Sequence, residues 1–540
     1  MLPPRSDLPG HEVTNQPPAR GDTDLWERDP ILAGLVTAFG GEPGHTHEHA
    51  RKLGQAIWRE RARDAARHPP ELRLFDAGGR RLDEVVFHPA YHQFLELGLG
   101  AGYAADPWQA PHGGHVHHAA LVYLHSQVEP GSCCPMTMTY AAVPVLTAHY
   151  QTAADWVPKL LSRRYDPSAR PLAEKAGATL GMAMTEKQGG SDVRANTSWA
   201  ERNGEHYRLT GHKWFCSAPM SDGFLTLAQA PGGLSCFLVP RWLAGGRNRI
   251  HLMRLKDKLG NRANASAEVE FHGAEAMLIG EEGRGISTIM EMVHHTRLDT
   301  AAAPAGLMRA ALAEAHHWVR HRAAFQRRLI DQPLMRAVLA DLVLDLEGAA
   351  ALVFRAAHAF DGSAATDRAF ARIAVALAKY LNNKLCPLVV AEAMEVLGGM
   401  GYVEDTPLPM LYREAPLNGI WEGSGNVICL DIRRTLERQQ AAAEALAGEL
   451  DSVWGNLPAY DAALSAHRAR WPGPPPEAEA RAFAESAALL LAGASVQKHA
   501  PAAVAEAFVS TRLRPGRLRF AGTAPGLNPD ILLARLGAAD

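Results

Sequence analysis

The sequence lacks several features that would place it in a specialised class of protein. Six cysteines in 540 residues are too few for a disulfide framework, and two of them, Cys133 and Cys134, are adjacent. The formal net charge is −3 at pH 7, so binding to nucleic acid or to a membrane would require a local patch. No uninterrupted apolar run reaches bilayer-spanning length, and the first residues are rich in proline and charge, unlike a cleavable signal. We therefore expect a cytoplasmic protein without membrane contact.

The length of the chain predicts several domains, because one hydrophobic core rarely extends over 540 residues. Residues 1–24 are rich in proline, glycine and charge and predict an extended arm, in which Asn15–Pro18 could dock on a neighbouring subunit. Residues 25–180 predict a helical domain. Its helix-length segments are 48–66, 91–102, 115–128 and 153–163.

Strand-like alternation replaces the helical pattern between residues 181 and 284. Turn signals such as Asn203-Gly204 and Gly245-Gly246 separate the strands. We predict a small antiparallel β domain, with strands at 195–200, 207–210, 224–228, 235–239 and 266–271.

Long helical segments rich in alanine and leucine then return over residues 285–440 and predict an antiparallel four-helix bundle. A proline-rich interruption at 472–476 marks a further region, and we predict an appended helical domain over 441–540. The predicted fold class is mainly α with a central β domain (α+β). The predicted helices are 286–327, 333–360, 367–400, 425–447 and 477–510.

Histidine clusters suggest a metal site, but none carries the spacing of a recognised zinc motif. We predict no metal and interpret these histidines as solvated or interface residues. The clusters are His45-Thr-His47-Glu-His49, His112 to His118, and His316-His317 with His321.

The stretch 181–199 carries the first chemical signal. The apolar run Ala178–Met184 predicts a buried strand, which breaks into a polar, glycine-rich loop. Glycine allows close approach to a flat or phosphorylated ligand, and the hydroxyls of Thr185 and Ser191 can bond ring carbonyls or phosphate oxygens. A polar hairpin turn without a ligand explains this segment equally well by itself.

Three segments together resemble the acyl-CoA dehydrogenase flavoproteins. They are the Thr-Glu-x-x-x-Gly-Ser-Asp loop at 185–192, the strand around Trp214–Ser217, and Trp-Glu-Gly at 421–423. Fuller strings, such as Lys-Asp-Lys-Leu-Gly-Asn-Arg at 256–262, are similar to the AidB-like branch, which belongs to the adaptive response to alkylation. The resemblance covers roughly residues 70–440 well and the last hundred residues weakly.

This resemblance implies an FAD protein with the acyl-CoA dehydrogenase fold and feeble dehydrogenase activity on a short branched, isovaleryl-CoA-like chain. It also implies binding to double-stranded DNA through the C-terminal domain and protection of that DNA against alkylation. A metabolic short branched-chain acyl-CoA dehydrogenase without a DNA role is the alternative, as is a flavoprotein with no DNA role.

Dehydrogenation of a thioester needs a base for the α-proton and an acceptor for the β-hydride, and no side chain accepts hydride. Glu422 is our candidate base, because Ile420 and Trp421 beside it can exclude water. Relatives that carry the base on an earlier helix place it where this chain has Thr296. The alternative for Glu422 is an exposed residue that caps the helix beginning near Gly425.

The resemblance also assigns the FAD site. It places the segments 182–191, 215–217 and 420–430 around the cofactor, and the helix start near Gly425 can receive the pyrophosphate. The implied cofactor-binding residues are Met182, Met184, Thr185, Gly190, Ser191, Phe215, Cys216, Ser217, Arg322, Gln332, Gly398, Gly399, Trp421, Gly423, Ser424, Gly425 and Asn426.

Within that set, Arg322-x-x-Phe325 with Gln332 resembles the segment that reaches the FAD of a neighbouring subunit, so we expect a homotetramer built as a dimer of dimers. Three residues depart from the family pattern: Cys216 replaces a threonine whose hydroxyl bonds flavin N5, Gln326 replaces a glycine, and Glu395 replaces a glutamine.

The last hundred residues contain the candidate DNA contacts. Nine Lys/Arg against ten Asp/Glu leave no positive excess in residues 441–540, but four arginines cluster around Pro515-Gly516. In a turn, four guanidiniums can meet successive phosphates, whereas the alternative is a solvated loop. The four are Arg512, Arg514, Arg517 and Arg519.

Overall fold

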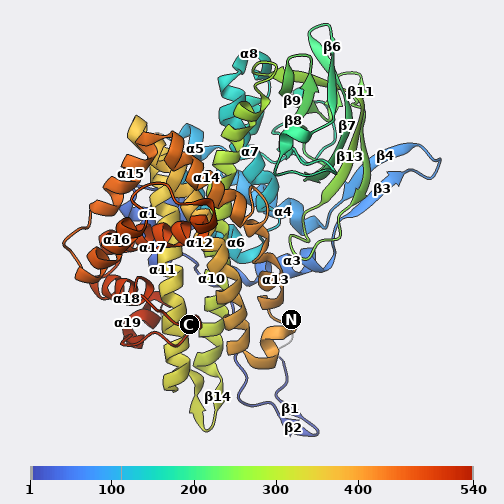
Figure 1. Ribbon diagram of the computed structural model, residues 1–540. Coiled ribbons are helices and arrows are strands. Elements are labelled where there is room, and N and C mark those ends of the chain that lie inside the picture. Colours follow the sequence, from blue (N-terminus) through green and yellow to red (C-terminus); the bar gives the residue numbers. More distant parts are fainter. Residues whose placement is uncertain (1–3, 111, 538–540) are drawn as a thin grey trace.

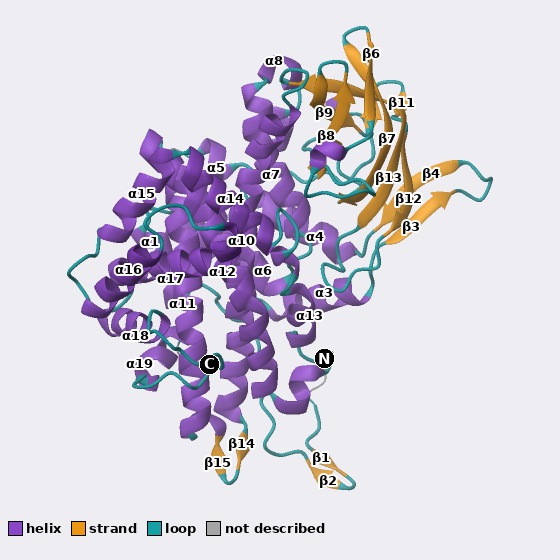
Figure 2. Cartoon of the chain, in the orientation of Figure 1, coloured by secondary structure: helices purple, strands orange, loops and turns teal. Residues whose placement is uncertain are grey.

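The computed structural model describes residues 4–110 and 112–537 and places a β domain beside one end of a long helical bundle (Figure 1). The N-terminal helices pack between the two, and the last helices cover one side of the bundle (Figure 2). The predicted α+β class is confirmed. Residues 1–3 of the predicted arm and 538–540 of the predicted last domain lie outside the described residues.

Helices dominate the N-terminal part, as predicted, but their limits differ from the prediction. Segment 48–66 is divided between two helices near Gly54, and most of 153–163 is not helical. The sequence pattern also missed the hairpin β3 (Glu71–Phe75) to β4 (Arg81–Val86), which projects away from the rest of the chain (Figure 2). The helices are α1 (Pro30–Ala38), α2 (Pro43–Leu53), α3 (Ala56–Arg67), α4 (Pro89–Gly100), α5 (Asp106–Gln109), α6 (Gly114–Val128), α7 (Cys133–Ala148), α8 (Tyr150–Ala153) and α9 (Val157–Leu160).

The central helices α6 and α7 are buried on nearly all sides, which explains why amphipathic periodicity did not reveal α7. Cys133, Cys134, Met136 and Tyr140 of α7 are all in the core. A helix that is apolar around its whole circumference must be enclosed by other elements. As a result, α7 lies where the N-terminal helices, the β domain and the bundle meet.

The β domain is one seven-stranded sheet with the order β12-β13-β7-β6-β8-β5, to which β9 adds by pairing with β13 and β8. The prediction of an antiparallel domain was incomplete, because β5 and β6 each pair with β8 in parallel. The strands are β5 (Leu180–Ala183), β6 (Trp199–Asn203), β7 (His206–Ser217), β8 (Gly223–Ala230), β9 (Gly233–Pro240), β12 (Ile250–Leu255) and β13 (Ser266–Ile279), with a small separate hairpin β10 (Trp242–Leu243) and β11 (Gly246–Arg247).

The bundle is built from long helices whose inner faces are alanine and leucine. Segment 286–327 is shorter than predicted and ends in a hairpin, β14 (Ala323–Ala324) with β15 (Arg327–Arg328), at the bundle end away from the β domain (Figure 2). Segment 425–447 is two helices, divided at Gln439. The helices are α10 (Gly285–His321), α11 (Pro333–Asp361), α12 (Ala365–Val396), α13 (Leu408–Glu414), α14 (Gly425–Arg438) and α15 (Gln440–Asp451).

Helix α12 is long and apolar enough to cross a membrane by length and composition, but 78% of its most apolar window is buried inside the protein. Its contacts with α10 and α11 make it the central helix of the bundle. The length and hydropathy of a helix in a protein core can equal those of a membrane-spanning helix, so these two properties alone do not indicate a membrane span.

The appended C-terminal helices pack against the bundle. The predicted helix 477–510 is interrupted at Ala500-Pro501, since proline cannot continue the hydrogen-bond ladder. Phe508 is fully buried and lies against Gly348 of α11. The helices are α16 (Pro458–Arg470), α17 (Ala480–His499), α18 (Ala502–Arg512) and α19 (Pro529–Leu533).

The N-terminal arm docks on its own chain. The Asn15 side chain pairs with both backbone groups of Ala323, at 2.9 and 2.7 Å, and its carbonyl accepts from Arg322 Nη1 at 2.6 Å. His317 Nε2 lies 2.9 Å from the Pro18 carbonyl oxygen. The arm also contains a short hairpin, β1 (Asp7–Leu8) with β2 (His11–Glu12). The segment Asn15–Pro18 therefore docks on the far end of the bundle within its own chain, and docking on a neighbouring subunit stays a prediction.

Candidate functional site

Glu422 lies in a tight turn at the start of α14 and points back into the bundle. Its carboxylate Oε2 accepts a hydrogen bond from Thr296 Oγ1 of α10 at 2.9 Å, and its backbone carbonyl lies 3.3 Å from Arg297 Nε. The residue has φ of 57°, a left-handed conformation that is uncommon for a residue other than glycine. The helix-cap alternative is wrong, because the N-cap of α14 is Ser424 and Glu422 bonds another helix.

The environment of Glu422 raises the pKa of its carboxyl group. Burial is the largest cause, since it disfavours the ionised form. The Thr296 hydrogen bond and the charges of Lys379 and Arg297 act in the opposite direction. Arg297 is itself neutralised by Asp431, at 2.6 Å. The result is a desolvated carboxyl group of the type that suits proton transfer.

The glycine-rich loop is fixed by long-range contacts with β7. The Trp214 backbone N–H donates to the Thr185 carbonyl at 2.8 Å, and Lys213 Nζ lies 2.8 Å from Glu186 Oε1 with neither side chain exposed. Burial opposes ionisation of Glu186, but Lys213 and backbone donors lower its pKa to about 2. The predicted buried strand is confirmed as β5, all of whose residues are buried. The loop is therefore rigidly attached where β5 ends.

Side chains of the N-terminal domain connect this loop to Glu422. The Met182 backbone N–H donates to Met138 Sδ of α7 at 3.3 Å. One turn earlier on α7 lies the buried Cys134, and burial, together with the charge of the nearby Glu422, raises the pKa of its thiol to about 12. Residues of three domains thus meet at one place.

Around this junction lie exposed apolar side chains and unpaired polar groups that are available to bind a ligand. Phe215 is 49% exposed and Ile420 65% exposed, which is unusual for large apolar side chains beside a half-buried carboxylate. Within residues 4–110 and 112–537, the hydroxyls of Thr185 and Ser191 have no hydrogen-bond partner, and the first turn of α14 has no side-chain cap. A flat ring system with a phosphorylated tail suits such a surface.

Cys216 is buried, with 1% exposure, and faces the core instead of solvent. Burial raises the pKa of its thiol to about 12. The thiol is a weak hydrogen-bond donor in comparison with the threonine hydroxyl of the family pattern.

Other predicted cofactor residues lie away from this junction within one chain. Arg322 and Gln332 sit at the β14–β15 end of the bundle, where the Gln332 amide donates to Ala324 at 3.0 Å. At the tip of that hairpin Phe325 is 94% exposed, and Gln326 has φ of 62°, which explains the glycine of the family pattern. Gly398 and Gly399 follow α12, and a Cβ atom added to either would meet open space.

The histidine clusters have a different role from the one we predicted. Of the clustered histidines, His49, His115, His117, His118 and His316 are buried, so the interpretation as solvated or interface residues is wrong for them. His118 Nε2 lies 2.7 Å from Asp299 Oδ1, and burial lowers the pKa of His125 to about 3. Within the described residues, no group of three or more His, Cys, Asp or Glu side chains could hold a metal ion.

The four clustered arginines lie in two different environments, one buried and one exposed. Arg512 is 3% exposed and forms ion pairs with Asp341 at 2.5 Å and Asp345 at 2.9 Å, both on α11. It cannot contact DNA, and its prediction as a DNA-binding residue is wrong. Arg514 and Arg519 are exposed, and Arg517 lies 3.4 Å from Asp345 with its side chain 30% exposed. Sequence spacing did not reveal that the first arginine faces the bundle.

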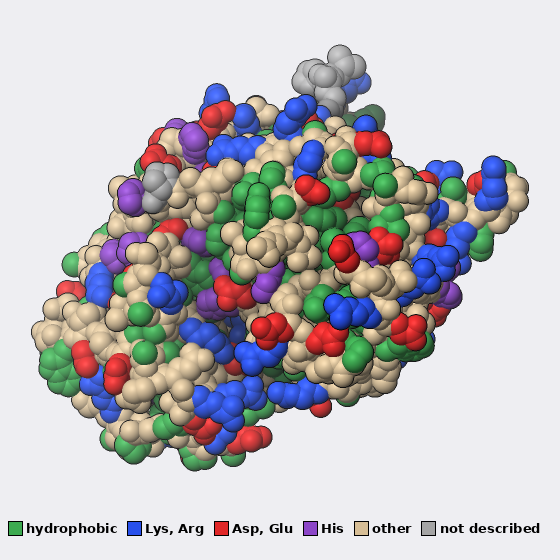
Figure 3. All heavy atoms as spheres, turned by 90° about the horizontal axis from the view of Figure 1, so that it is seen from above, with side chains coloured by type: hydrophobic (Ala, Val, Ile, Leu, Met, Phe, Trp, Pro, Cys, Tyr) green, Lys and Arg blue, Asp and Glu red, His purple; other side chains and the backbone are tan. Residues whose placement is uncertain are grey.

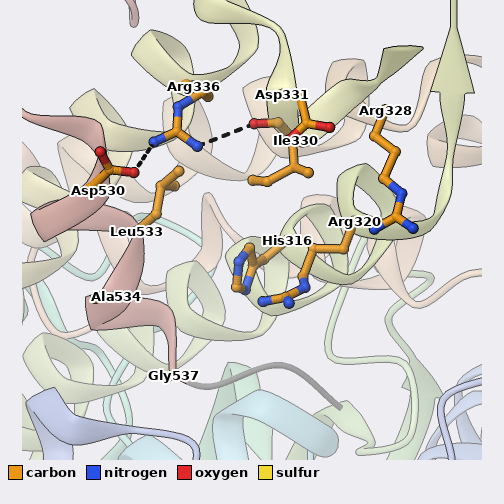
Figure 4. A pocket seen from close by; sticks show the side chains of 10 residues that line it. All are labelled: His316, Arg320, Arg328, Ile330, Asp331, Arg336, Asp530, Leu533, Ala534 and Gly537. Atoms are coloured by element: carbon orange, nitrogen blue, oxygen red, sulfur yellow. Dashed lines mark hydrogen bonds and ion pairs between the residues drawn. The ribbon is translucent and has the colours of Figure 1, made fainter. Parts of the chain in front are cut away.

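A cavity of about 350 Å³ lies elsewhere, between the end of α10 and α19. Arg336 on its rim is paired with Asp530 and donates to the Ile330 carbonyl (Figure 4). This cavity contains none of the residues around Glu422, so its size does not identify the functional site.

Comparison with known protein families gives three matches along the chain. Residues 15–167 match the adaptive response protein AidB N-terminal domain, 181–274 the acyl-CoA dehydrogenase middle domain, and 283–437 the acyl-CoA dehydrogenase C-terminal domain. None of the three extends over the appended helices.

Individual proteins are similar over almost the whole chain. AidB of Escherichia coli strain K12 is 45% identical over 514 residues, which cover 93% of this chain and 94% of that protein. The crystal structure of Caenorhabditis elegans ACDH-11 in complex with C11-CoA has a TM-score of 0.84 at 27% identity and covers 96% of each chain. An acyl-CoA dehydrogenase from Bacillus anthracis, complexed with FAD, has a TM-score of 0.64 at 19% identity and covers 78% of this chain and 81% of that one.

Proposed function

The chain belongs to the acyl-CoA dehydrogenase family, in its AidB branch, and we propose that it is an FAD-dependent oxidoreductase acting on the Cα–Cβ bond of an acyl-CoA. The observation that carries this proposal is the Glu422 carboxylate, held by Thr296 where three domains meet. A carboxylate in a dry, partly apolar setting is what abstraction of a weakly acidic α-proton requires.

FAD fits the groups that surround this junction. The proposed contacts to its ring system are the 182–191 loop and the strand Phe215–Ser217, and the uncapped start of α14 faces its phosphates. When bound, FAD supplies the hydride acceptor that no side chain provides. ACDH-11 binds C11-CoA in its crystal structure, which supports an acyl-CoA as the ligand that lies against Glu422.

The residues of the chain have separate tasks in this proposal. Glu422 takes the α-proton on its carboxylate, and Thr296 orients that carboxylate. Trp421 packs against the core beside it, and Ile420, which is 65% exposed, excludes water once a bound acyl chain covers it. Since Cys216 is buried and its thiol is a weak donor, we propose that the dehydrogenase activity is weak. The proposed substrate, a short branched, isovaleryl-CoA-like acyl chain, rests on membership of the AidB branch.

The test is the variant Glu422→Gln, which keeps the size of the side chain and removes the base. Flavin reduction by an acyl-CoA panel should fall by roughly two to four orders of magnitude, because general-base catalysis contributes about that much. FAD content should stay normal. A variant that reduces its flavin as fast as the parent would exclude Glu422 as the base.

We propose that the active protein is a homotetramer, a dimer of dimers. Arg322, Phe325 and Gln332 lie too far along the bundle to join Glu422 in the same chain, and Phe325 is almost wholly exposed. Phe325 is an exposed aromatic residue at a hairpin tip, close to the guanidinium group of Arg322. Such a side chain is suited to bury itself in the surface of a second copy of the chain. In that assembly the exposed glycines Gly398 and Gly399 provide a surface that FAD of a neighbouring subunit can approach.

We also propose that the chain binds double-stranded DNA and protects it from alkylation. Supporting this, the appended helices fall outside the dehydrogenase family matches, and the loop after α18 presents exposed Arg514, Arg517 and Arg519. Leu518, between the last two arginines, and Phe520, directly after them, are also exposed, at 65% and 77%. On the face drawn in Figure 3, basic and acidic side chains are interspersed, so binding would depend on such a local loop.

A further inference from the structure

Lys379 is a buried lysine of α12 that is directed at the turn carrying Glu422. Its exposure is 1%, and its Nζ donates to two backbone carbonyls, those of Asn418 at 2.8 Å and Gly423 at 2.9 Å. Within the described residues, no carboxylate lies within ion-pair distance of this ammonium group. A buried lysine without a carboxylate at contact distance is costly to keep, so its placement calls for an explanation.

The two carbonyls mark the two ends of one turn. Between them lie Trp421, whose indole N–H donates to Asn418 Oδ1 at 2.7 Å, and Glu422 in its left-handed conformation. A left-handed backbone is unfavourable for a residue with a Cβ atom, so the turn persists only when its surroundings hold it. One ammonium group that binds both ends provides such a hold.

The same ammonium group acts on Glu422 through its charge. It lowers the pKa of Glu422, in opposition to burial, and burial lowers the pKa of Lys379 itself to about 7, which the Glu422 charge partly offsets. The other charged groups around the pair are Arg297, which is bonded to Asp431, and Lys384. Both protonation states of the amine retain enough N–H groups to donate to both carbonyls.

We propose that Lys379 is a positioning residue for Glu422: it clamps the turn 418–423 at both ends and thereby holds the carboxylate against Thr296. The clamp itself stands on the observed hydrogen bonds, and its role in proton abstraction rests on the proposed function of Glu422. Lys379 contributes no atom to the reacting bonds.

The first test measures the clamp without any assay of activity. In Lys379→Met, hydrogen–deuterium exchange of the segment 416–425 should be about 10- to 100-fold faster, because two hydrogen bonds from one charged donor are lost. The control is Lys52→Met, an exposed lysine of α2 paired with Glu48, which should leave that segment unchanged. If Lys379→Met does not fold, Lys379→Gln, which keeps a polar amide, replaces it. Unchanged exchange in the folded variant would overturn the clamp.

The second test separates positioning from simple structural support. In the FAD-loaded protein, we expect a pH titration of flavin absorbance to report ionisation of Glu422, and Glu422→Gln should abolish that transition. Lys379→Met should move the transition up by about one pH unit, since a nearby positive charge is removed. A transition that stays at the parent pH would refute the effect on Glu422. If Glu422→Gln leaves the transition intact, the assignment of Glu422 fails, while the exchange test still decides the clamp.

Discussion

Arg512 offers the sharpest test of how the appended helices are attached to the bundle. Its guanidinium lies between two carboxylates of α11, Asp341 at 2.5 Å and Asp345 at 2.9 Å, and it is 3% exposed. Asp341 also accepts from the Gly522 backbone N–H at 2.9 Å, so this one carboxylate joins α11, α18 and the loop after it. The change Arg512→Met would leave both acids without their principal partner.

The size of the effect follows from burial. Removing one partner of a buried ion pair costs about 3–5 kcal/mol, because the remaining charge is uncompensated. We therefore expect local unfolding of α18 to become easier by that amount, which corresponds to roughly 10²- to 5 × 10³-fold faster hydrogen exchange of its amides. Exchange is the suitable assay, since a multidomain chain need not unfold in one step.

The matched control is Arg514→Met, two residues further on and exposed. A surface substitution of this kind changes stability by no more than about 0.5 kcal/mol. A second variant, with Arg512, Asp341 and Asp345 all replaced by apolar residues, should recover much of the loss, because no buried charge is left. If the α18 amides exchange at the same rate in Arg512→Met as in Arg514→Met, the reasoning from burial is refuted.

Three further predictions concern function. Burial raises the pKa of Glu422 above the ordinary 4.5 of glutamate, and only the ionised carboxylate can act as a base. Acyl-CoA-dependent flavin reduction should therefore decline as the pH falls through a value above 4.5. A decline only below 4.5 would show that the carboxyl group is solvated. Phe325→Asp should convert the proposed tetramer into smaller species in sedimentation, since a charge would be placed at the exposed hairpin tip; a tetramer of unchanged stability would put the contact elsewhere. Duplex binding should show a log–log salt slope of about −3 per engaged subunit, because Arg512 is unavailable and three arginines remain. Replacing Arg514, Arg517 and Arg519 with alanine should flatten that slope and leave FAD untouched; an unaltered slope would move the DNA surface to another part of the protein.

Local chemistry in the sequence was enough to predict most elements of the fold. Alternation in the β domain is set by residues two apart and alanine–leucine periodicity in the bundle by residues three or four apart, so β8, β9, α11 and α12 lie close to their predicted limits. Breaks were harder to place. The interruption at Pro501 was visible in the sequence and overlooked, whereas the break at Gln439 has no strong local signal.

The candidate site depended on the family motifs as well as on local pattern. Glu422, the loop from Thr185 and the strand at Trp214 were named from the sequence, and the structure brings them to one junction. Their partners were not named. Thr296 was considered only as the position of an absent base, and Lys379, which bonds the turn that carries Glu422, was not singled out.

Contacts between residues far apart in the chain account for what the sequence left open. Thr296 and Glu422 are 126 positions apart, and Arg512 and Asp345 are 167 apart, so no local pattern records that each pair meets in the core. The histidines of α6 read as polar surface residues, yet packing of α6 against α7 and α10 encloses them. The sequence by itself determined the class of fold, the order of its domains and the residues that carry a motif. Only the tertiary structure decided which charged groups are buried, because desolvation depends on every element that packs around a side chain and not on its neighbours along the chain.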